Sequence, residues 1–236
     1  MSVKSVLFNT DMVRAILDGR KTVTRRLVKV PPYYPYFYKL YINTDGAITS
    51  TRNRLYAGFY REEQIFYIDG ERHVDAVYYQ APYQSGDILY VRETWHKYKK
   101  RIGKGEGCHI AEFYGYKASI ANSEDADEPW KPSIHMPKEA ARIWLKVKDV
   151  RVERLQEITE DGAKNEGARQ CYEVIDTLEN RPVTYLAEDR QGYYILGFKQ
   201  IWNSTIKKSD LDRYGWDASP WVWVIEFERC EKPENM

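Results

Sequence analysis

The sequence predicts an α+β protein in which a β-barrel core carries flanking short helices and hairpin insertions. Strand-like segments with alternating apolar residues occur from the beginning of the chain to its end. Aromatic residues are abundant, with 20 Tyr, 7 Trp and 7 Phe among 236 residues. Bulky rings fill a pleated surface well, but they also suit base stacking, so composition alone does not choose between a core and a binding surface.

Charge and cysteine content limit the partners and the compartment. Lys and Arg number 36 and Asp and Glu 35, which argues against a broad basic face but leaves room for a local basic pocket. Three cysteines far apart in the sequence fit free thiols in a reducing compartment better than disulfides. No apolar run approaches transmembrane length and no signal-peptide pattern opens the sequence, so we expect a soluble cytoplasmic protein with no membrane partner.

The first 28 residues predict a strand, a short helix and a second strand. Residues 3–8 have a strand pattern, and Thr10 or Asp11 can cap the helix that follows. Gly19 stands where a helix end favours a left-handed residue. The β-branched segment 21–28 is typical of extended chain.

Residues 31–80 predict a loop followed by two hairpins. Repeated prolines exclude regular helix from residues 31–38, PPYYPYFY. The dipeptides Asp45-Gly46 and Asp69-Gly70 are strong hairpin-turn signals with alternating flanks. We therefore expect two hairpins between residues 39 and 80.

The middle of the chain predicts strands separated by polar loops. SGDILYVRETW at 85–95 indicates a turn and a buried strand, and HIAEFYGYKAS at 109–119 indicates another strand. Between them, residues 97–107 form a basic, glycine-containing loop, and residues 121–133 form an acidic one. Residues 142–155 show the best pattern in the chain for a pair of strands.

The last third predicts two helices and a closing strand. Thr159 can cap a helix over ITEDGAKNEG, and a second helix is expected around residues 193–202. The final segment, PWVWVIEFERC at 220–230, alternates as a strand does. Because neither a repeat nor a linker is evident, we expect one domain over residues 1–236, with insertions at about 27–83 and 96–135.

The histidines and cysteines do not predict a metal site. The four histidines show no i, i+4 pairing, and adjacent Cys108 and His109 have poor geometry for two ligands of one ion. There is no P-loop, no G-x-G-x-x-G fingerprint and no G-x-S-x-G elbow. We therefore predict neither a metal nor a cofactor.

The segment GRKTVTRR at 19–26 is the most informative part of the chain. Cations at a helix end and threonines in a strand have an ordinary structural explanation, which is favoured for the segment alone. The functional interpretation is a pocket for an anion or a polar base. In it, Lys21 is buried with a lowered pKa, can take a proton from the hydroxyl of Thr24, and so activates that oxygen as a nucleophile.

Two further segments contain candidate site residues, and each candidate also has an ordinary structural explanation. Arg92 and Trp95, at the end of the strand in SGDILYVRETW, can face a pocket, or Arg92 can pair with Glu93 or another surface acid. Glu166, near the end of the ITEDGAKNEG helix, is a candidate site residue, although a solvated carboxylate is the usual fate of such a side chain.

The order of these motifs resembles that of the ASCH domain family, within the PUA-like β-barrel superfamily. The motifs are G-R-K-T-x-T-x-R, G-D-x-L-x-V, L-x-x-I-T-E-x-x-A-x-x-E-G and a final V-I-E-F. The longer, prophage-associated members are the most similar. The resemblance covers most of the chain in order, but not residues 27–83 or 96–135.

The resemblance implies a nucleoside- or RNA-related function. In a small bacterial ASCH enzyme that deacetylates N4-acetylcytidine, the catalytic Lys, Thr and Glu match Lys21, Thr24 and Glu166. The implied activity is amide hydrolysis of an acylated base, with those three side chains meeting at one mouth of a closed barrel. Ligand contacts are then expected from Arg25, Arg26, Arg92 and Trp95.

Two other functions stay open at this point. One is a non-catalytic module that binds a modified nucleotide or short RNA, and the other is a phage-derived interaction scaffold. A local basic cluster predicts binding that depends weakly on salt. A steep dependence would instead point to an extended basic track such as KYKKRIGK at 97–104.

Overall fold

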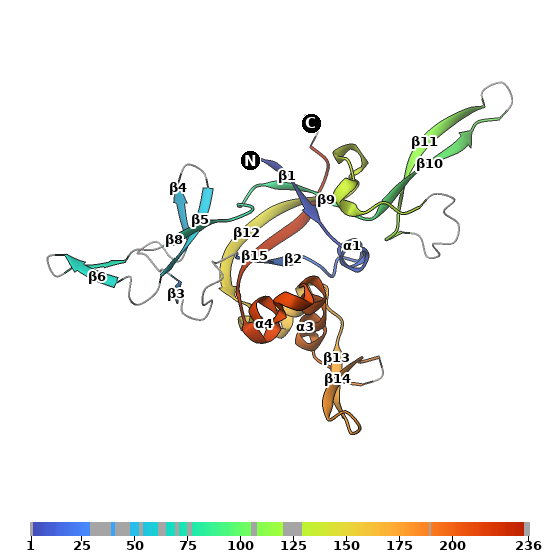
Figure 1. Ribbon diagram of the computed structural model, residues 1–236. Coiled ribbons are helices and arrows are strands. Elements are labelled where there is room, and N and C mark those ends of the chain that lie inside the picture. The colour runs from blue at the N-terminus through green and yellow to red at the C-terminus, as the bar shows by residue number, and fades with distance from the viewer. Residues whose placement is uncertain are drawn as a thin grey trace. The chain divides into compact units, whose positions relative to one another are not determined.

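The computed structural model shows a mixed α+β protein that consists mostly of sheet with few helices (Figure 1). It describes residues 2–28, 39–40, 48–51, 54–60, 65–68, 71–74, 77–104, 108–119, 129–188 and 190–233. The chain divides into two compact units, each described below by itself. Unit 1 comprises Met1–Lys21, Gly86–Lys146 and Glu228–Met236, and unit 2 comprises Thr22–Ser85 and Val147–Phe227.

The largest sheet has five strands in the hydrogen-bonded order β1-β9-β12-β15-β2. Their bounds are Val3–Leu7 for β1, Ile88–Arg92 for β9, Trp144–Arg154 for β12, Trp221–Cys230 for β15 and Val23–Leu27 for β2. The expected strand pair at 142–155 is therefore wrong, because this segment is one long strand. Among the described strands no closed barrel is found.

In unit 1, helix α1 (Thr10–Leu17) follows β1, which pairs in parallel with β9. The helix is capped by Asn9, whose side chain accepts from the Met12 N–H at 2.9 Å, and not by Thr10 or Asp11 as predicted. Asn9, Thr10 and Asp11 are all residue types that cap helices well. Asn9 is the cap because it precedes the first helical residue and has the extended backbone that a cap requires. Gly19 takes the predicted left-handed conformation, with φ of 73°.

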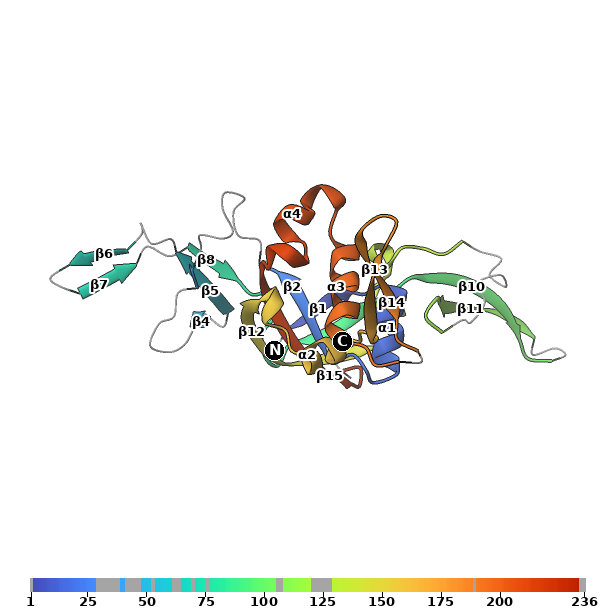
Figure 2. The same ribbon diagram turned by 90° about the horizontal axis from the view of Figure 1, so that it is seen from below.

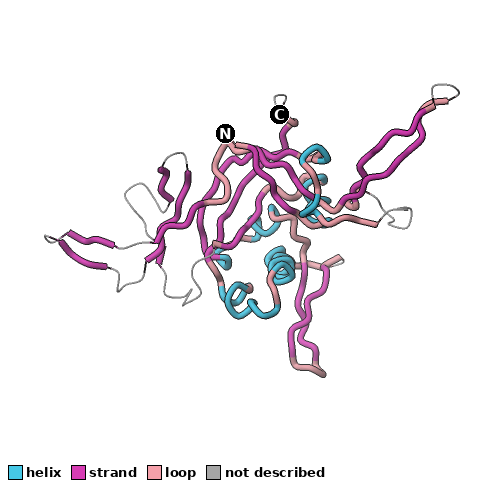
Figure 3. Tube along the Cα trace, turned by 45° about the horizontal axis from the view of Figure 1, so that its top comes forward, coloured by secondary structure: helices cyan, strands magenta, loops and turns pink. Residues whose placement is uncertain are grey.

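A long hairpin, β10 (Trp95–Ile102) and β11 (His109–Tyr116), continues unit 1 (Figure 3). The strand predicted at 109–119 is confirmed. The basic loop predicted from residue 97 is wrong over residues 97–102, because cross-strand pairing with the aromatic β11 holds the lysines in a strand. Most of the predicted acidic loop at 121–133 lies outside the described residues.

In unit 2, β2 pairs antiparallel with β15, and helices pack against them. The helices are α2 (Glu160–Asn165), α3 (Tyr194–Thr205) and α4 (Leu211–Tyr214). Thr159 caps α2 as predicted, accepting from the Gly162 N–H at 3.0 Å. Beside α3 lies α4, where Trp202 Nε1 donates to the Tyr214 carbonyl at 2.8 Å (Figure 2).

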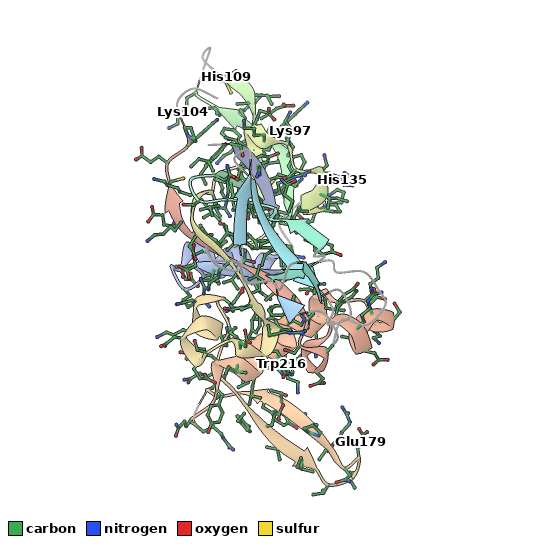
Figure 4. All side chains as sticks on the ribbon, turned by 90° about the vertical axis from the view of Figure 1, so that its left-hand side faces the viewer. Lys97, Lys104, His109, His135, Glu179 and Trp216 are labelled. Carbon is green, nitrogen blue, oxygen red and sulfur yellow. The ribbon has the colours of Figure 1, made fainter. Side chains whose placement is uncertain are left out.

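A second hairpin, β13 (Cys171–Asp176) and β14 (Arg181–Leu186), belongs to unit 2 and was not predicted. Its turn contains Asn180 with φ of 48°, a left-handed conformation that Asn tolerates better than most residues. Figure 4 labels Glu179 at the end of this hairpin.

Between residues 39 and 80 the structure describes strands only. They are β3 (Lys39–Leu40), β4 (Ile48–Thr51), β5 (Arg54–Tyr60), β6 (Ile65–Ile68), β7 (Glu71–Val74) and β8 (Val77–Gln80). The hairpin predicted around Asp69-Gly70 is confirmed by the antiparallel pairing of β6 with β7. The turn predicted at Asp45-Gly46 lies outside the described residues, and β4 pairs with the following β5. The predicted loop at 31–38 lies outside the described residues.

Short 3-10 helices connect several of these elements. They are η5 (Ser133–His135), η6 (Lys138–Ala140), η7 (Leu155–Glu157), η8 (Lys208–Asp210) and η9 (Trp216–Ala218). None of the described helices is long and apolar enough to span a membrane.

Candidate functional site

Arg25 lies on β2 and points toward the helical side of unit 2. Side chains of a strand alternate between its two faces, so Val23, Arg25 and Leu27 share one face. Val23 and Leu27 pack in the core of unit 2 with Phe198 of α3. The guanidinium carbon of Arg25 lies 5.8 Å from the centre of the Phe198 ring, which confirms the direction of the side chain.

Two carboxylates bind the Arg25 guanidinium. Its Nε donates to Glu153 Oε1 at 3.0 Å, and its Nη1 donates to Glu166 Oε1 at 3.3 Å. The side chains of Arg25 and Glu166 are only 3% and 5% exposed. One buried cation therefore faces two anions, which is charge-assisted hydrogen bonding in a setting with little water to screen it.

The cluster continues from Glu153 along β12. Arg151 Nε lies 3.6 Å from Glu153 Oε2, and Arg151 also binds Asp149 and Glu226. Burial opposes the charge of Arg151, but its hydrogen bond to Glu226 and the charges of Glu226 and Glu153 outweigh burial, so the pKa of Arg151 is raised. Within this cluster two arginines meet four carboxylates.

Glu166 owes its position to the short helix α2. Thr159 begins the helix and Glu166 ends it, with its N–H donating to the Gly162 carbonyl at 3.1 Å. Gly167 follows with φ of 83°, a left-handed conformation that lets the chain turn directly after Glu166. The solvated helical carboxylate considered above is therefore wrong for Glu166, which is buried.

Thr24 and Arg26 lie on the opposite face of β2 from Arg25. In the antiparallel register with β15, Thr24 pairs with Ile225 and Arg26 pairs with Trp223. Thr24 is 3% exposed, and Arg26 is partly buried. The predicted nucleophile thus lies in a well-packed strand, on the face that the Arg25 cluster does not use.

Lys21 is the last residue of Met1–Lys21, the first segment of unit 1. Its side chain is 2% exposed, its N–H donates to the Ala15 carbonyl at 3.0 Å, and its Nζ lies 5.5 Å from the centre of the Phe8 ring. Thr24 and Glu166 belong to unit 2. The meeting of the three side chains in one pocket stays a prediction.

Arg92 and Trp95 are both held by contacts within unit 1. Arg92 Nε donates to the Met136 carbonyl at 3.0 Å and its Nη2 donates to the Ile134 carbonyl, whereas Glu93 pairs with Arg142. Trp95 packs in a core cluster that contains Met136 and Trp144. Their ligand contacts stay predictions, and the observed contacts give both side chains a role in the fold.

The structure thus brings Arg25 and Glu166 together and adds Glu153, which sequence analysis missed. Glu153 is 128 residues from Arg25 in the chain. The only local signal was a charged residue at the end of a long alternating segment, and such residues usually face solvent. Within the described residues, no group of three His, Cys, Asp or Glu side chains is arranged to hold a metal ion.

Comparisons with protein-family models, with curated proteins and with solved structures found no match to this chain.

Proposed function

We propose that the protein is an amidohydrolase that removes the acyl group from an acylated nucleobase, with N4-acetylcytidine as the reference substrate. The observation that carries the proposal is burial. Lys21, Thr24 and Glu166, which match the catalytic residues of the similar ASCH enzyme, all belong to the small set of buried polar side chains in the described part of the chain. Lysine and glutamate are rarely buried unless the site uses or pairs them.

The reaction proceeds in two balanced steps. The Thr24 hydroxyl attacks the amide carbonyl and gives its proton to Lys21, forming an acyl-threonine ester as the C–N bond breaks. Lys21 passes this proton through Glu166 to the exocyclic nitrogen, which leaves as a neutral amine. Water then hydrolyses the ester, which releases the carboxylic acid and restores the Thr24 hydroxyl.

Burial suits the role proposed for Lys21. Removal from water disfavours the charged form of an ammonium group, which is what a lysine base needs near neutral pH. Arg25 holds Glu166 by one oxygen, Oε1, and so fixes the orientation of the carboxylate. A PUA-like barrel is part of the proposal, because its mouth is where Lys21, Thr24 and Glu166 would meet.

The charges around Arg25 also favour an uncharged substrate. The side chain of Arg25 is 3% exposed and already binds Glu153 and Glu166, so its charge is not available to a phosphate. A nucleoside is therefore a better substrate than a nucleotide. For the same reason, Arg25 is a poor phosphate contact for the alternative of a binding module.

The test is acetate release from N4-acetylcytidine by the wild type and by Lys21→Ala. We expect release by the wild type and a loss of most turnover in the variant, with the fold intact by circular dichroism. Equal rates in the two proteins would rule out this mechanism. Absence of release from both would favour the non-catalytic nucleotide- or RNA-binding module.

A further inference from the structure

The β10–β11 hairpin concentrates positive charge. Residues 95–117 contain six Lys and Arg and two Glu, a formal charge of +4, whereas the whole chain carries +1. The remainder of the chain therefore carries −3. Figure 4 labels Lys97, Lys104 and His109 on this hairpin. A local excess of this kind is the electrostatic footprint of a polyanion partner.

The register of β10 with β11 shows which cations of the hairpin face an acid and which do not. On one face Lys97 forms an ion pair with Glu112, and this hydrogen bond raises the pKa of Lys97 and lowers that of Glu112. Lys100 lies opposite Ala111 and Arg101 opposite Ile110, so neither has an acid across the strand pair. Both side chains are exposed, and neither forms an ion pair with another described residue.

Aromatic rings follow the face of the hairpin that carries Lys100, opposite to the face of Lys97 and Arg101, because side chains alternate along a strand. The rings of Trp130 and His96 are 4.5 Å apart, those of His96 and Tyr98 5.4 Å, and those of Tyr98 and Phe113 5.7 Å at an angle of 28°. Gly115 makes room for the ladder, because a Cβ at that position would lie 1.9 Å from His96 Nε2. Tyr98 is 36% exposed, so the ladder reaches the solvent.

We propose that the β10–β11 hairpin binds single-stranded nucleic acid, either RNA or DNA. Cations that follow the phosphates and rings that stack on unpaired bases are the two elements of such sites, and here one hairpin supplies both. A duplex hides its base faces, so it leaves the rings unused. This binding is additional to the proposed hydrolase activity, because a single nucleoside has no chain of phosphates for Lys100 and Arg101.

The first test is fluorescence anisotropy with labelled 12-nucleotide oligouridine and oligothymidine at several salt concentrations. Lys100→Glu/Arg101→Glu should bind at least about ten-fold more weakly. For this variant, the slope of log affinity against log salt concentration should be smaller in magnitude than that of the wild type by about 1.4. Each lost phosphate contact on a single strand removes ~0.7 from the slope. The matched control is Lys207→Glu/Lys208→Glu, which reverses two adjacent exposed cations of unit 2 and should change affinity less than about two-fold.

The second test isolates stacking. Tyr98→Ala should weaken binding about ten-fold for oligonucleotides that have bases, and leave unchanged the binding of an abasic strand of the same length. Tyr98→Phe keeps the ring and should bind like the wild type. Thermal melting of each variant shows whether the hairpin change has altered the fold.

Several outcomes would overturn the proposal. They are equal affinity of the hairpin variant and its control, tighter binding of the matched duplex, stronger binding of phosphatidylglycerol vesicles than of oligonucleotides, and no oligonucleotide binding by the wild type. Failure of acetate release would leave these results unaffected, so the two proposals fail separately.

Discussion

Each unit of the protein pairs an arginine with a buried carboxylate, but the two sites balance charge differently. In unit 1, Arg142 binds Glu93 with two parallel hydrogen bonds of 2.9 Å, one cation to one anion. The guanidinium also stacks on Tyr116, with its carbon 4.1 Å from the ring centre. In unit 2, Arg25 is shared between Glu153 and Glu166.

The difference separates a structural pair from a candidate site. A bidentate, one-to-one pair satisfies both charges within itself, so its role is to hold the fold. Arg25 instead bridges the buried Glu166 and the partly exposed Glu153, and Glu153 also binds Arg151, so the charges here are balanced only across a network. The proposed hydrolysis is placed at this network because the network holds Glu166.

The largest expected effect comes from neutralising Glu166. Glu166→Gln keeps the shape of the side chain and removes its capacity to carry a proton, so turnover should fall by about 10²–10⁴. The matched control is Glu153→Gln, the same change in the other carboxylate that binds Arg25, which should lower turnover by less than about ten-fold. Initial rates of acetate release measure both. If the two variants lost turnover to a similar extent, Glu166 would act only by binding Arg25, as Glu153 does.

The corresponding change in unit 1 should act on stability instead. Glu93 is 1% exposed, so Glu93→Gln leaves Arg142 without its carboxylate partner and should reduce the free energy of unfolding by about 3 kcal/mol. Arg142 is partly exposed, which places the expected cost at the low end of that for buried pairs. Urea titration gives the value.

A double-mutant cycle distinguishes a pair from two independent residues. Replacing both partners, as in Glu93→Gln/Arg142→Met, removes the unpaired charge, so the cost should be clearly less than the sum of the two single changes. Additive costs would contradict the self-contained pair.

The sequence predicted local elements better than long-range contacts. Thr159, Gly19 and the alternating final strand each act within a few residues, and the structure has them as predicted. The segment at 97–102 was misassigned because its lysines and the glycines that follow it at 103, 105 and 107 favour a loop locally, while the pairing partner β11 lies beyond the turn.

The same reason limits what could be predicted of the site. Burial of Lys21, Thr24 and Glu166 agrees with the motif that singled them out, but the partner Glu153 comes from a strand far along the chain. Ion pairs of this kind have no spacing rule in the sequence, because the fold alone decides which strand ends meet. Of the charged residues in 149–154, only the structure shows which one reaches Arg25.

A smaller effect is expected at the two helix caps, one in each unit. Thr159→Ala and Asn9→Ala should each lower the free energy of unfolding by about 1 kcal/mol, because each leaves a backbone N–H of the first turn without its acceptor. Only Thr159 supports the six-residue helix that ends at Glu166. Thr159→Ala should therefore also reduce acetate release per folded molecule, measured with urea melts on the same samples. A loss of activity limited to Asn9→Ala would contradict the proposed role of α2.

The smallest effect should come from Tyr116, beside the pair in unit 1. Burial raises the pKa of its hydroxyl, opposed by Arg142 and aided by Glu93, and the hydroxyl donates to the Ala140 carbonyl at 2.6 Å. The folded protein therefore keeps this proton at pH values where the unfolded chain begins to lose it. The stabilisation is complete below pH ~10, the ordinary tyrosine pKa, and declines as the pH rises through the higher folded value.

Tyr116→Phe lacks the titrating group, so its stability should fall less steeply than that of the wild type between pH 9.5 and about 11 in thermal melts. Tyr193→Phe, which changes an exposed tyrosine of unit 2, is the matched control and should follow the wild type. Parallel curves for Tyr116→Phe and the wild type would show that the hydroxyl is not protected by the fold.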